Sequence, residues 1–391
     1  MKKILLGFLF CYFSFGYSQE INLSPQSTIS VLTCGPGADL YTAFGHSAFR
    51  VQDPVLGIDV VYNYGTFNFN RPGFYTDFVK GKLIFSLSRQ RTTNFLNVYE
   101  FEKRWVKEQE LQLTLAEKNT LLKYLENNNR PENKTYTYDY LYDNCSSKIR
   151  DVLDDNLGKQ IVYDTNFVPS PFTFRELIHQ KLPTNSWGSF GIDLALSSVI
   201  DVKASVQEHH FLPDYMFQQL VHTTKNNAPF VTKERTLLKA PLKQQESSFL
   251  STPLFWFCLF LLLVGFFTYL DYKRNTRRRW LDFFIFLVSG APGLLLFFLW
   301  FFTDHGATAG NFNMLWAFPL NTIVAFFVLR KNMPKWISSY LILSLLLLLL
   351  TLVSGVLGLQ VFSPLIIPLC LTLGLRYAFL FVFHKKARQL S

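Results

Sequence analysis

The last third of this chain contains five long apolar segments separated by short polar loops, which leaves a membrane as the main place where it can fold. A helix needs about 20 apolar residues to cross a hydrocarbon core about 30 Å thick. The segments that approach or reach this length are residues 253–269, 281–302, 312–329, 337–357 and 361–383. We therefore predict an all-α domain of five transmembrane helices over residues 252–391.

Basic residues mark one side of the predicted helices. Eleven of them lie in the loops after the first and third segments and in the tail, whereas the loops 303–310 and 358–360 contain none. Because Lys-rich and Arg-rich loops remain in the cytoplasm, the C-terminus is expected there and the chain before residue 252 outside. The eleven residues are Lys273, Arg274, Arg277, Arg278, Arg279, Arg330, Lys331, Lys335, Lys385, Lys386 and Arg388.

The first residues have the pattern of an export signal. Lys2 and Lys3 precede an apolar run over 4–15, which is too short to span a bilayer comfortably. Small residues at Gly16 and Ser18 suit signal peptidase, so we predict a signal peptide over 1–18. Cys11 does not indicate a lipoprotein signal, because the bulky Phe10 precedes it.

The part between the signal and the first apolar segment is mixed in composition and is predicted to be an α+β domain over residues 19–236. Residues 27–33, 47–52 and 59–64 are rich in β-branched and aromatic residues, as strands are. Leucines recur with helical spacing over 113–127. A second helix is expected to run to residue 157, with Asp143 or Asn144 as its cap. The polar stretch 237–251 is the predicted linker.

Cys145 and His46 are candidates for nucleophilic chemistry. Cys145, in YDYLYDNCSSKIRD, lies where the second helix should begin, and the free N–H groups and dipole of a helix start favour a thiolate. His46, in FGHSAFRV, begins a predicted strand and is the candidate base. These local patterns are also compatible with a buried cysteine and a histidine that have only structural roles. They also leave open a Cys34–Cys145 disulfide, since these are the only cysteines between the signal and the apolar segments.

Several blocks of the chain resemble a known family. The order of GHSAFRV before NCSSKIRD is similar to that of the circularly permuted papain-like group, which includes NlpC-type peptidases and lecithin:retinol acyltransferases. More specifically, the chain resembles the bacterial lipoprotein N-acyltransferases of the Lnb type. The blocks that carry this resemblance are TCGPGADLYTAFGHSAFRV, VVYNYGTFNF, YDYLYDNCSSKIRD, FLPDYM and FFTDHGATAGNFNMLWAFP.

The resemblance implies a cysteine-dependent acyltransferase in the bacterial inner membrane, with a permuted papain-like periplasmic domain and no cofactor. Cys145 would attack a membrane phospholipid, the acyl donor, and form a thioester. The α-amine of a diacylglyceryl-cysteine lipoprotein, the acceptor, would then receive the acyl chain. His46 would be the general base. A third polar residue usually orients the histidine; Asn63 is the candidate, and Tyr62, Tyr64 and Asp143 compete for the role.

One predicted outside loop carries polar residues at the edge of the bilayer: Asp304, His305, Asn311 and Asn313. We interpret them as a substrate-binding cluster that meets a lipid head group or the site of the soluble domain. The alternative is a polar turn beside an interfacial Trp316. Arg376, within the last apolar segment, is expected either to face protein or to snorkel to the surface.

The sequence also bears on other partners and on functions other than acyl transfer. The net charge is +10, but the basic residues form no single stripe, so nucleic acid is not an expected partner. No metal site is predicted, and the adjacent His209 and His210 are expected on the surface. The alternative functions are a membrane-anchored NlpC-type amidase or peptidase of the cell wall and a binding or assembly factor without catalysis. Five spans are more than a wall enzyme needs.

Overall fold

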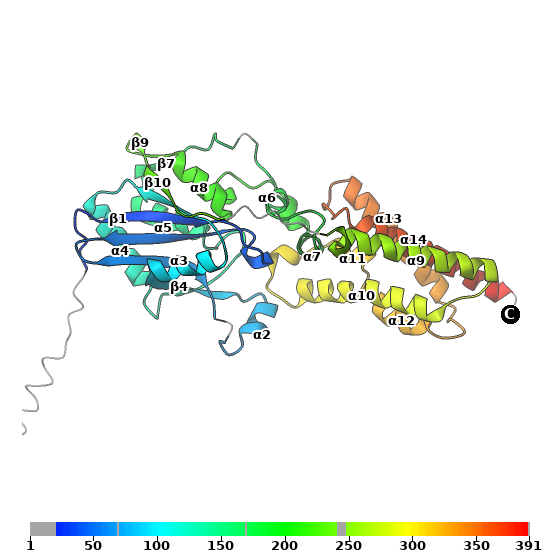
Figure 1. Cartoon of the computed structure of the whole chain (residues 1–391). Coiled ribbons are helices and arrows are strands. Elements are labelled where there is room, and N and C mark those ends of the chain that lie inside the picture. Colours follow the sequence, from blue (N-terminus) through cyan, green and yellow to red (C-terminus); the bar gives the residue numbers. More distant parts are fainter. Residues whose placement is uncertain (1–20, 69, 169, 241–247, 390–391) are drawn as a thin grey trace, which may run out of the picture.

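The computed structural model describes residues 21–68, 70–168, 170–240 and 248–389. A sheet-rich domain is followed by a bundle of long helices, as Figure 1 shows, so the α+β class with a C-terminal helical region is confirmed. The predicted signal peptide lies outside the described residues. So do residues 241–247 of the predicted linker.

An antiparallel sheet of seven strands forms the centre of the first domain, in the order β10-β5-β1-β2-β3-β4-β6. The three predicted strands are confirmed as β1, β2 and β3, neighbours in the middle of this sheet. The bounds are β1 Thr28–Cys34, β2 His46–Asp53, β3 Ile58–Thr66, β4 Ile84–Arg91, β5 Val106–Leu111, β6 Thr135–Thr137 and β10 Val231–Leu238. Strand β10 therefore extends two residues into the predicted linker.

Helices cover both faces of the sheet. The two predicted helices are confirmed as α4 (Leu115–Asn128) and α5 (Ser147–Leu157), which share one core with the sheet. In α5 the apolar side chains Ile149, Val152 and Leu153 recur at helical spacing and all point into that core. Helix α3 (Thr92–Phe101) packs on the opposite face.

Shorter elements connect this sheet to the helical bundle. Helix α2 (Phe74–Val79) lies between β3 and β4. Helices α6 (Phe174–His179), α7 (Trp187–Ala195) and α8 (Pro213–Val221) follow α5, together with a small sheet of β7 (Ile161–Tyr163), β8 (Thr223–Lys225) and β9 (Ala228–Pro229). Figure 1 shows α6 and α7 between the main sheet and the bundle, and α2 projecting beside the near end of α10.

Four helices of the bundle are long and apolar enough to cross a membrane: α9 (Pro253–Arg274), α10 (Arg279–Phe301), α13 (Ile337–Val356) and α14 (Ile366–Gln389). The third predicted segment differs, because it divides into α11 (Asn313–Trp316) and α12 (Asn321–Val328). Pro319 lies in the break, where its ring disfavours helical backbone at the residue before it. A Cβ atom on Gly293 of α10 would collide with the carbonyl of Ala317. Because Gly293 has no side chain, the backbone between α11 and α12 can pack directly against α10.

Charged residues inside the bundle are paired. Arg376 is fully buried and forms ion pairs with Asp271 (2.9 Å) and Asp282 (2.7 Å), so it faces protein and does not snorkel. At the end remote from the sheet domain, Arg277 donates hydrogen bonds to the carbonyl oxygens of Val328 (2.7 Å) and Arg330 (2.6 Å). The basic loops after α9 and α12 therefore meet at the end where Figure 1 marks the C-terminus.

Candidate active site

His46 is placed by a glycine that no other residue replaces easily. Gly45 has φ +84°, and a Cβ atom there would lie 2.9 Å from the carbonyl oxygen of Cys34. The chain turns sharply at Gly45 and enters β2 with His46 paired opposite Cys34. The Gly-His-Ser pattern is thus a turn followed by the first residue of a central strand.

Asn144 holds the segment that carries Cys145. Its side-chain oxygen accepts hydrogen bonds from the backbone N–H groups of Ser146 (2.8 Å) and Ser147 (2.9 Å), so it satisfies two N–H groups at the start of α5, although the N-cap position itself is Ser146 and not Asp143 or Asn144 as predicted. Its side-chain nitrogen donates to the carbonyl oxygens of Tyr140 (2.8 Å) and Phe211 (2.8 Å). The last contact connects the FLPDYM block to the segment that carries Cys145, because Phe211 is the first residue of that block.

Cys145 and His46 meet at the end of the sheet. His46 is hydrogen-bonded to Cys145, and its Nε2 atom donates to Oδ1 of Asn63 (2.5 Å). Asn63 therefore fixes the proton on Nε2 and leaves Nδ1 to face the thiol. Gly65 (φ +83°) permits this approach, since its missing Cβ atom would lie 3.3 Å from Cβ of Cys145.

Electrostatic interactions within the pair oppose the effect of burial. Burial alone would raise the pKa of the Cys145 thiol, but the charge and hydrogen bond of His46 and the backbone N–H of Ser47 outweigh it and lower that pKa. Burial alone would lower the pKa of His46, whereas the charge of Cys145 and hydrogen bonds to Cys145 and Asn63 raise it. Both shifts favour a thiolate–imidazolium pair, which is the nucleophilic form of a cysteine.

The competitors of Asn63 have other partners. Side chains alternate across a strand, so Tyr62 and Tyr64 point into the core shared with α5 while Asn63 points to the other face. Tyr62 donates to Glu126 (2.5 Å), Tyr64 accepts from Asn128 (2.9 Å), and Asp143 pairs with Lys148 (2.7 Å). The geometry thus favours Asn63 as the residue that orients His46.

Cys34 is a thiol of a different kind. All four cysteines among the described residues are free, so the structure has no Cys34–Cys145 disulfide. Cys34 is fully buried, and burial raises its pKa to about 12 despite a hydrogen bond with Tyr99. It is therefore a buried structural thiol, the alternative that the sequence left open for Cys145.

The four polar residues of the outside loop do not gather around Cys145. The buried Asn311 and Asn313 donate to backbone carbonyl oxygens at the end of α7, and the bonds from Asn311 are 2.8 Å to Leu194 and 3.0 Å to Ala195. His305 donates to the carbonyl of Phe78 (3.1 Å), and the N–H of Asp304 donates to the carbonyl of Lys80 (2.8 Å). Trp316 is buried and donates to Asn313, so it does not lie in an interfacial belt.

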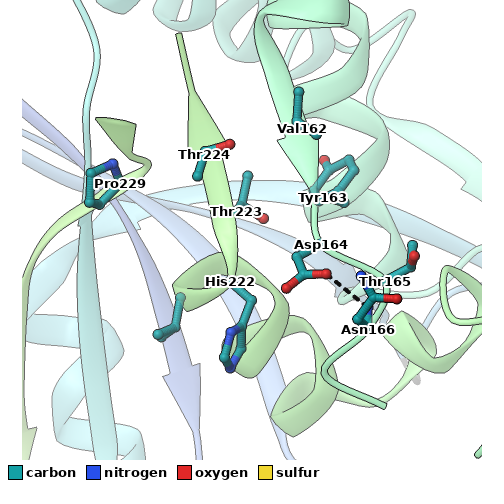
Figure 2. A pocket seen from close by; sticks show the side chains of 10 residues that line it. Val162, Tyr163, Asp164, Thr165, Asn166, His222, Thr223, Thr224 and Pro229 are labelled. Atoms are coloured by element: carbon teal, nitrogen blue, oxygen red, sulfur yellow. Dashed lines mark hydrogen bonds between the residues drawn. The ribbon is translucent and has the colours of Figure 1, made fainter. Parts of the chain in front are cut away.

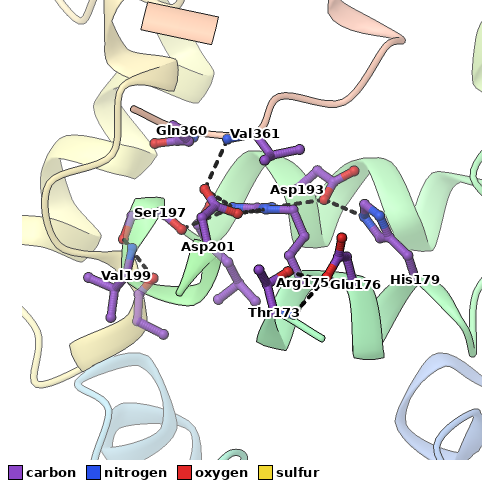
Figure 3. A network of polar contacts seen from close by, with 12 residues as sticks. Thr173, Arg175, Glu176, His179, Asp193, Ser197, Val199, Asp201, Gln360 and Val361 are labelled. Atoms are coloured by element: carbon purple, nitrogen blue, oxygen red, sulfur yellow. Dashed lines mark hydrogen bonds and ion pairs between the residues drawn. The ribbon is translucent and has the colours of Figure 1, made fainter. Parts of the chain in front are cut away.

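An ion network fastens the sheet domain to the bundle beside this loop (Figure 3). Arg175 of α6 is almost fully buried and pairs with Asp193 (2.9 Å) and Asp201 (2.5 Å). Asp201 in turn accepts a hydrogen bond from the N–H of Val361 (2.9 Å), in the loop before α14. The loops between the helices thus serve as a docking surface for the sheet domain.

Two other features lie apart from the site. The adjacent His209 and His210 are fully buried, so their expected surface location is wrong; they bond Ser205 (2.7 Å) and Gln219 (3.1 Å). The pocket in Figure 2 lies between β7, β8 and the end of α8, and neither Cys145 nor His46 lines it. Among the described residues, no group of three or more His, Cys, Asp or Glu is arranged to hold a metal ion.

Sequence reasoning missed three contributors to this geometry: Gly65, the N–H of Ser47 and the double role of Asn144. The only signal for Gly65 is its place directly after the predicted strand 59–64, since a glycine in a strand often marks a close approach of another group. The Ser47 contact involves only backbone and has no signature in the sequence.

Two family models match the chain. One, described as the Lnb N-terminal periplasmic domain, matches residues 18–180, and the other, described as the Lnb transmembrane domain, matches residues 244–388. The first contains His46, Asn63 and Cys145, and the second covers the helices of the bundle up to residue 388, near the end of α14. Comparisons with curated proteins and with solved structures gave no significant match.

Proposed function

Because both of its domains match models of one family, the chain belongs to the Lnb family of lipoprotein N-acyltransferases, and we propose that it works through an acyl-enzyme on Cys145. The donor is a membrane phospholipid, and the acceptor is the α-amine of a diacylglyceryl-cysteine lipoprotein. The observation that carries this proposal is the hydrogen-bonded series Cys145–His46–Asn63 at the end of the sheet.

In the first step the Cys145 thiolate attacks an ester carbonyl of the phospholipid. A carbon–sulfur bond forms, the ester carbon–oxygen bond breaks, and the His46 imidazolium gives its proton to the departing lysophospholipid oxygen. The oxyanion needs N–H donors. Those of Ser146 and Ser147 are occupied by Asn144, whereas the N–H groups of Cys145 and Ser47 lie against the sulfur and are the candidates.

In the second step the lipoprotein amine attacks the thioester. A carbon–nitrogen bond forms and the carbon–sulfur bond breaks. His46 takes a proton from the amine, which restores the thiolate–imidazolium pair. Throughout both steps Asn63 holds Nε2 and keeps Nδ1 directed at the reacting atoms.

The bundle places this chemistry at the surface where both lipids reside. The family assigns the N-terminal domain to the periplasm of a bacterial inner-membrane protein. We propose that α11 and α12 together form a fifth, broken pass, which leaves the C-terminus in the cytoplasm. The basic loops that meet at the remote end of the bundle support this orientation. A tethered site gains effective concentration over a free one.

The test is the mass of the N-terminal peptide of a reporter lipoprotein. Cells with the gene should yield the triacylated peptide, and cells that lack it or carry Cys145→Ala should yield a peptide without the N-acyl chain. A triacylated reporter in the Cys145→Ala cells, with no second N-acyltransferase present, would overturn the proposal. Release of stem peptides from cell wall would then favour the amidase alternative.

A further inference from the structure

A continuous series of aromatic rings leads from the nucleophile to the surface of the sheet domain. Tyr138 lies beside Cys145, because the missing Cβ atom of Gly65 would be 3.8 Å from Tyr138 and 3.3 Å from Cys145. The Tyr138 ring stacks on Phe85 with centroids 4.3 Å apart, and Phe85 meets Phe67 at 5.0 Å. We call Tyr138, Phe85, Phe67, Phe74 and Phe78 the aromatic path.

The path ends on helix α2. Phe67 stacks on Phe74 at 6.0 Å, and Phe74 on Phe78 at 6.2 Å. Phe74 is buried, but Phe78 is 50% exposed, and its helix neighbours Tyr75 and Val79 are 68% and 48% exposed. A short helix that directs so much apolar surface outward is typical of a site that meets lipid or another apolar partner.

Contacts between α2 and the bundle identify what lies against this surface. The carbonyl oxygens of Phe78 and Lys80 accept from His305 and from the N–H of Asp304, directly after α10. That end of α10 presents a belt of exposed aromatic residues: Phe297, Phe298, Trp300, Phe301 and Phe302. Such a belt marks the membrane–water interface. Helix α2 therefore lies at the level where the bilayer surface is expected.

We propose that the aromatic path guides the acyl chain of the donor phospholipid from the outer leaflet to Cys145, with α2 resting in the interface as its entrance. This inference rests on the proposed acyl transfer from phospholipid. Aromatic rings bind hydrocarbon by burial of apolar area, and the four phenylalanines of the path carry no group that competes for the thioester.

Charge at the end of α2 favours a phospholipid there. Lys80 and Lys82 are both exposed, and the acidic Asp77 is paired with Arg71 (2.7 Å). The exposed Asp304 lies beside Lys80, so the two lysines outnumber the one remaining carboxylate there. Two lysines at the interface attract lipid phosphate. The path therefore has a cationic rim at its outer end and a nucleophile at its inner end, which matches a phospholipid whose ester must reach Cys145.

The experiment measures the rate of acyl-enzyme formation on the full-length protein in lipid nanodiscs, as the increase in intact mass after mixing with phosphatidylethanolamine. The variants are Phe85→Ala and Phe78→Ser, compared with Phe101→Ala, which removes an 88% exposed ring at the end of α3. We expect Phe85→Ala and Phe78→Ser to acylate about tenfold more slowly or worse with a long-chain donor. A short-chain donor, which does not need the path, should react nearly as fast as in the unmodified protein. Phe101→Ala should change neither rate.

Each other outcome is informative. If the unmodified protein gains no acyl mass, the proposed function fails before the path is tested. If it gains mass and the path variants match it with both donors, the path is wrong and the function stands. If the variants acylate normally but release the chain slowly to a diacylated lipopeptide, the path serves the acceptor and the proposal is also overturned. Alkylation of Cys145 by iodoacetamide at the unmodified rate shows that each variant is folded.

Discussion

At the scale of single residues, two cysteines on the same domain differ because their neighbours differ. Cys34 is buried among apolar side chains, and its pKa rises to about 12. Cys145 is also buried, but His46 and the N–H of Ser47 lower its pKa. The sequence pointed to Cys145 by the helix start and the resemblance. The main interaction that lowers its pKa is with a histidine 99 residues away, and only the fold creates this contact.

The first prediction concerns the pH dependence of alkylation. The thiolate forms as pH rises through the pKa of Cys145, so a lowered pKa means that iodoacetamide reaches its full rate at lower pH than with an ordinary thiol. Asn63→Ala removes a hydrogen bond that raises the pKa of His46. The imidazolium then deprotonates at lower pH and stabilises the thiolate less, so the Cys145 profile should move to higher pH.

The same variant should slow acyl transfer about tenfold or more, since an unoriented imidazole is a poorer acid and base. Asn128→Ala is the matched control, because Asn128 bonds Tyr64 on the other face of β3. Peptide mapping of the alkylated protein assigns the rate to Cys145. An unchanged pH profile in Asn63→Ala would remove Asn63 from the mechanism.

A second prediction at this scale concerns Asn144. Asn144→Ala leaves two N–H groups and two carbonyl groups without their partner, which should cost about 3 kcal/mol of stability. Asn144→Asp keeps the acceptor for the N–H groups and should lose less. Thermal unfolding of the full-length protein measures both changes. Asn156→Ala, which removes only a bond within α5, is the control, and an equal loss in all three would refute the special role of Asn144.

At the scale of elements, the sequence pattern predicted those strands and helices whose formation depends mainly on the residues within them. Strands β1, β2 and β3 and helices α4 and α5 were predicted from alternation and helical spacing, and the structure has them within a few residues. The third span was predicted as one continuous helix, and this prediction was wrong. The segment divides into α11 and α12, because Pro319 interrupts it. Helix α2 was missed, since six residues are too few for a periodic signal, and with it the aromatic path.

The backbone between α11 and α12 packs against Gly293 of α10, so a side chain at this position should disturb the packing. An alanine there would overlap the carbonyl of Ala317, so Gly293→Ala should lower the stability of the bundle by about 1–3 kcal/mol. Gly265→Ala in α9 is the matched control, because its Cβ atom would meet only Leu375 at 3.8 Å. That variant should be neutral or slightly stabilising. Thermal unfolding in detergent distinguishes the two, and equal midpoints would contradict the packing described here.

At the scale of the whole molecule, the polar loop residues that the sequence suggested for substrate binding are largely used to join the two domains. Asn311 and Asn313 bond the end of α7, and His305 bonds α2. A single sequence could not distinguish these roles, because a buried amide that holds a helix end and an exposed amide that binds a head group are the same residue type. The arrangement holds the sheet domain in one orientation relative to the helical bundle.

This arrangement predicts that catalysis and thiol reactivity can be separated. Replacing both Asn311 and Asn313 with Ala should loosen the domain junction and slow acyl transfer from bilayer phospholipid about tenfold, because effective concentration falls. The rate at which soluble iodoacetamide alkylates Cys145 should not change, since the dyad is intact. Asn166→Ala, in an exposed turn far from the bundle, serves as the control. A parallel fall in both rates would mean that the junction shapes the active site itself.

We propose that the acyl chain passes through Cys145, and a measurement of the intact mass of the protein shows whether it does. The full-length protein in nanodiscs is mixed with one phospholipid and then with a diacylated lipopeptide that has a free α-amine. We predict a mass increase of one acyl group, located on Cys145 and released by hydroxylamine, which disappears as the lipopeptide becomes triacylated. Triacylation by Cys145→Ser, or an acyl group carried on any other residue, would rule out an acyl-enzyme on Cys145.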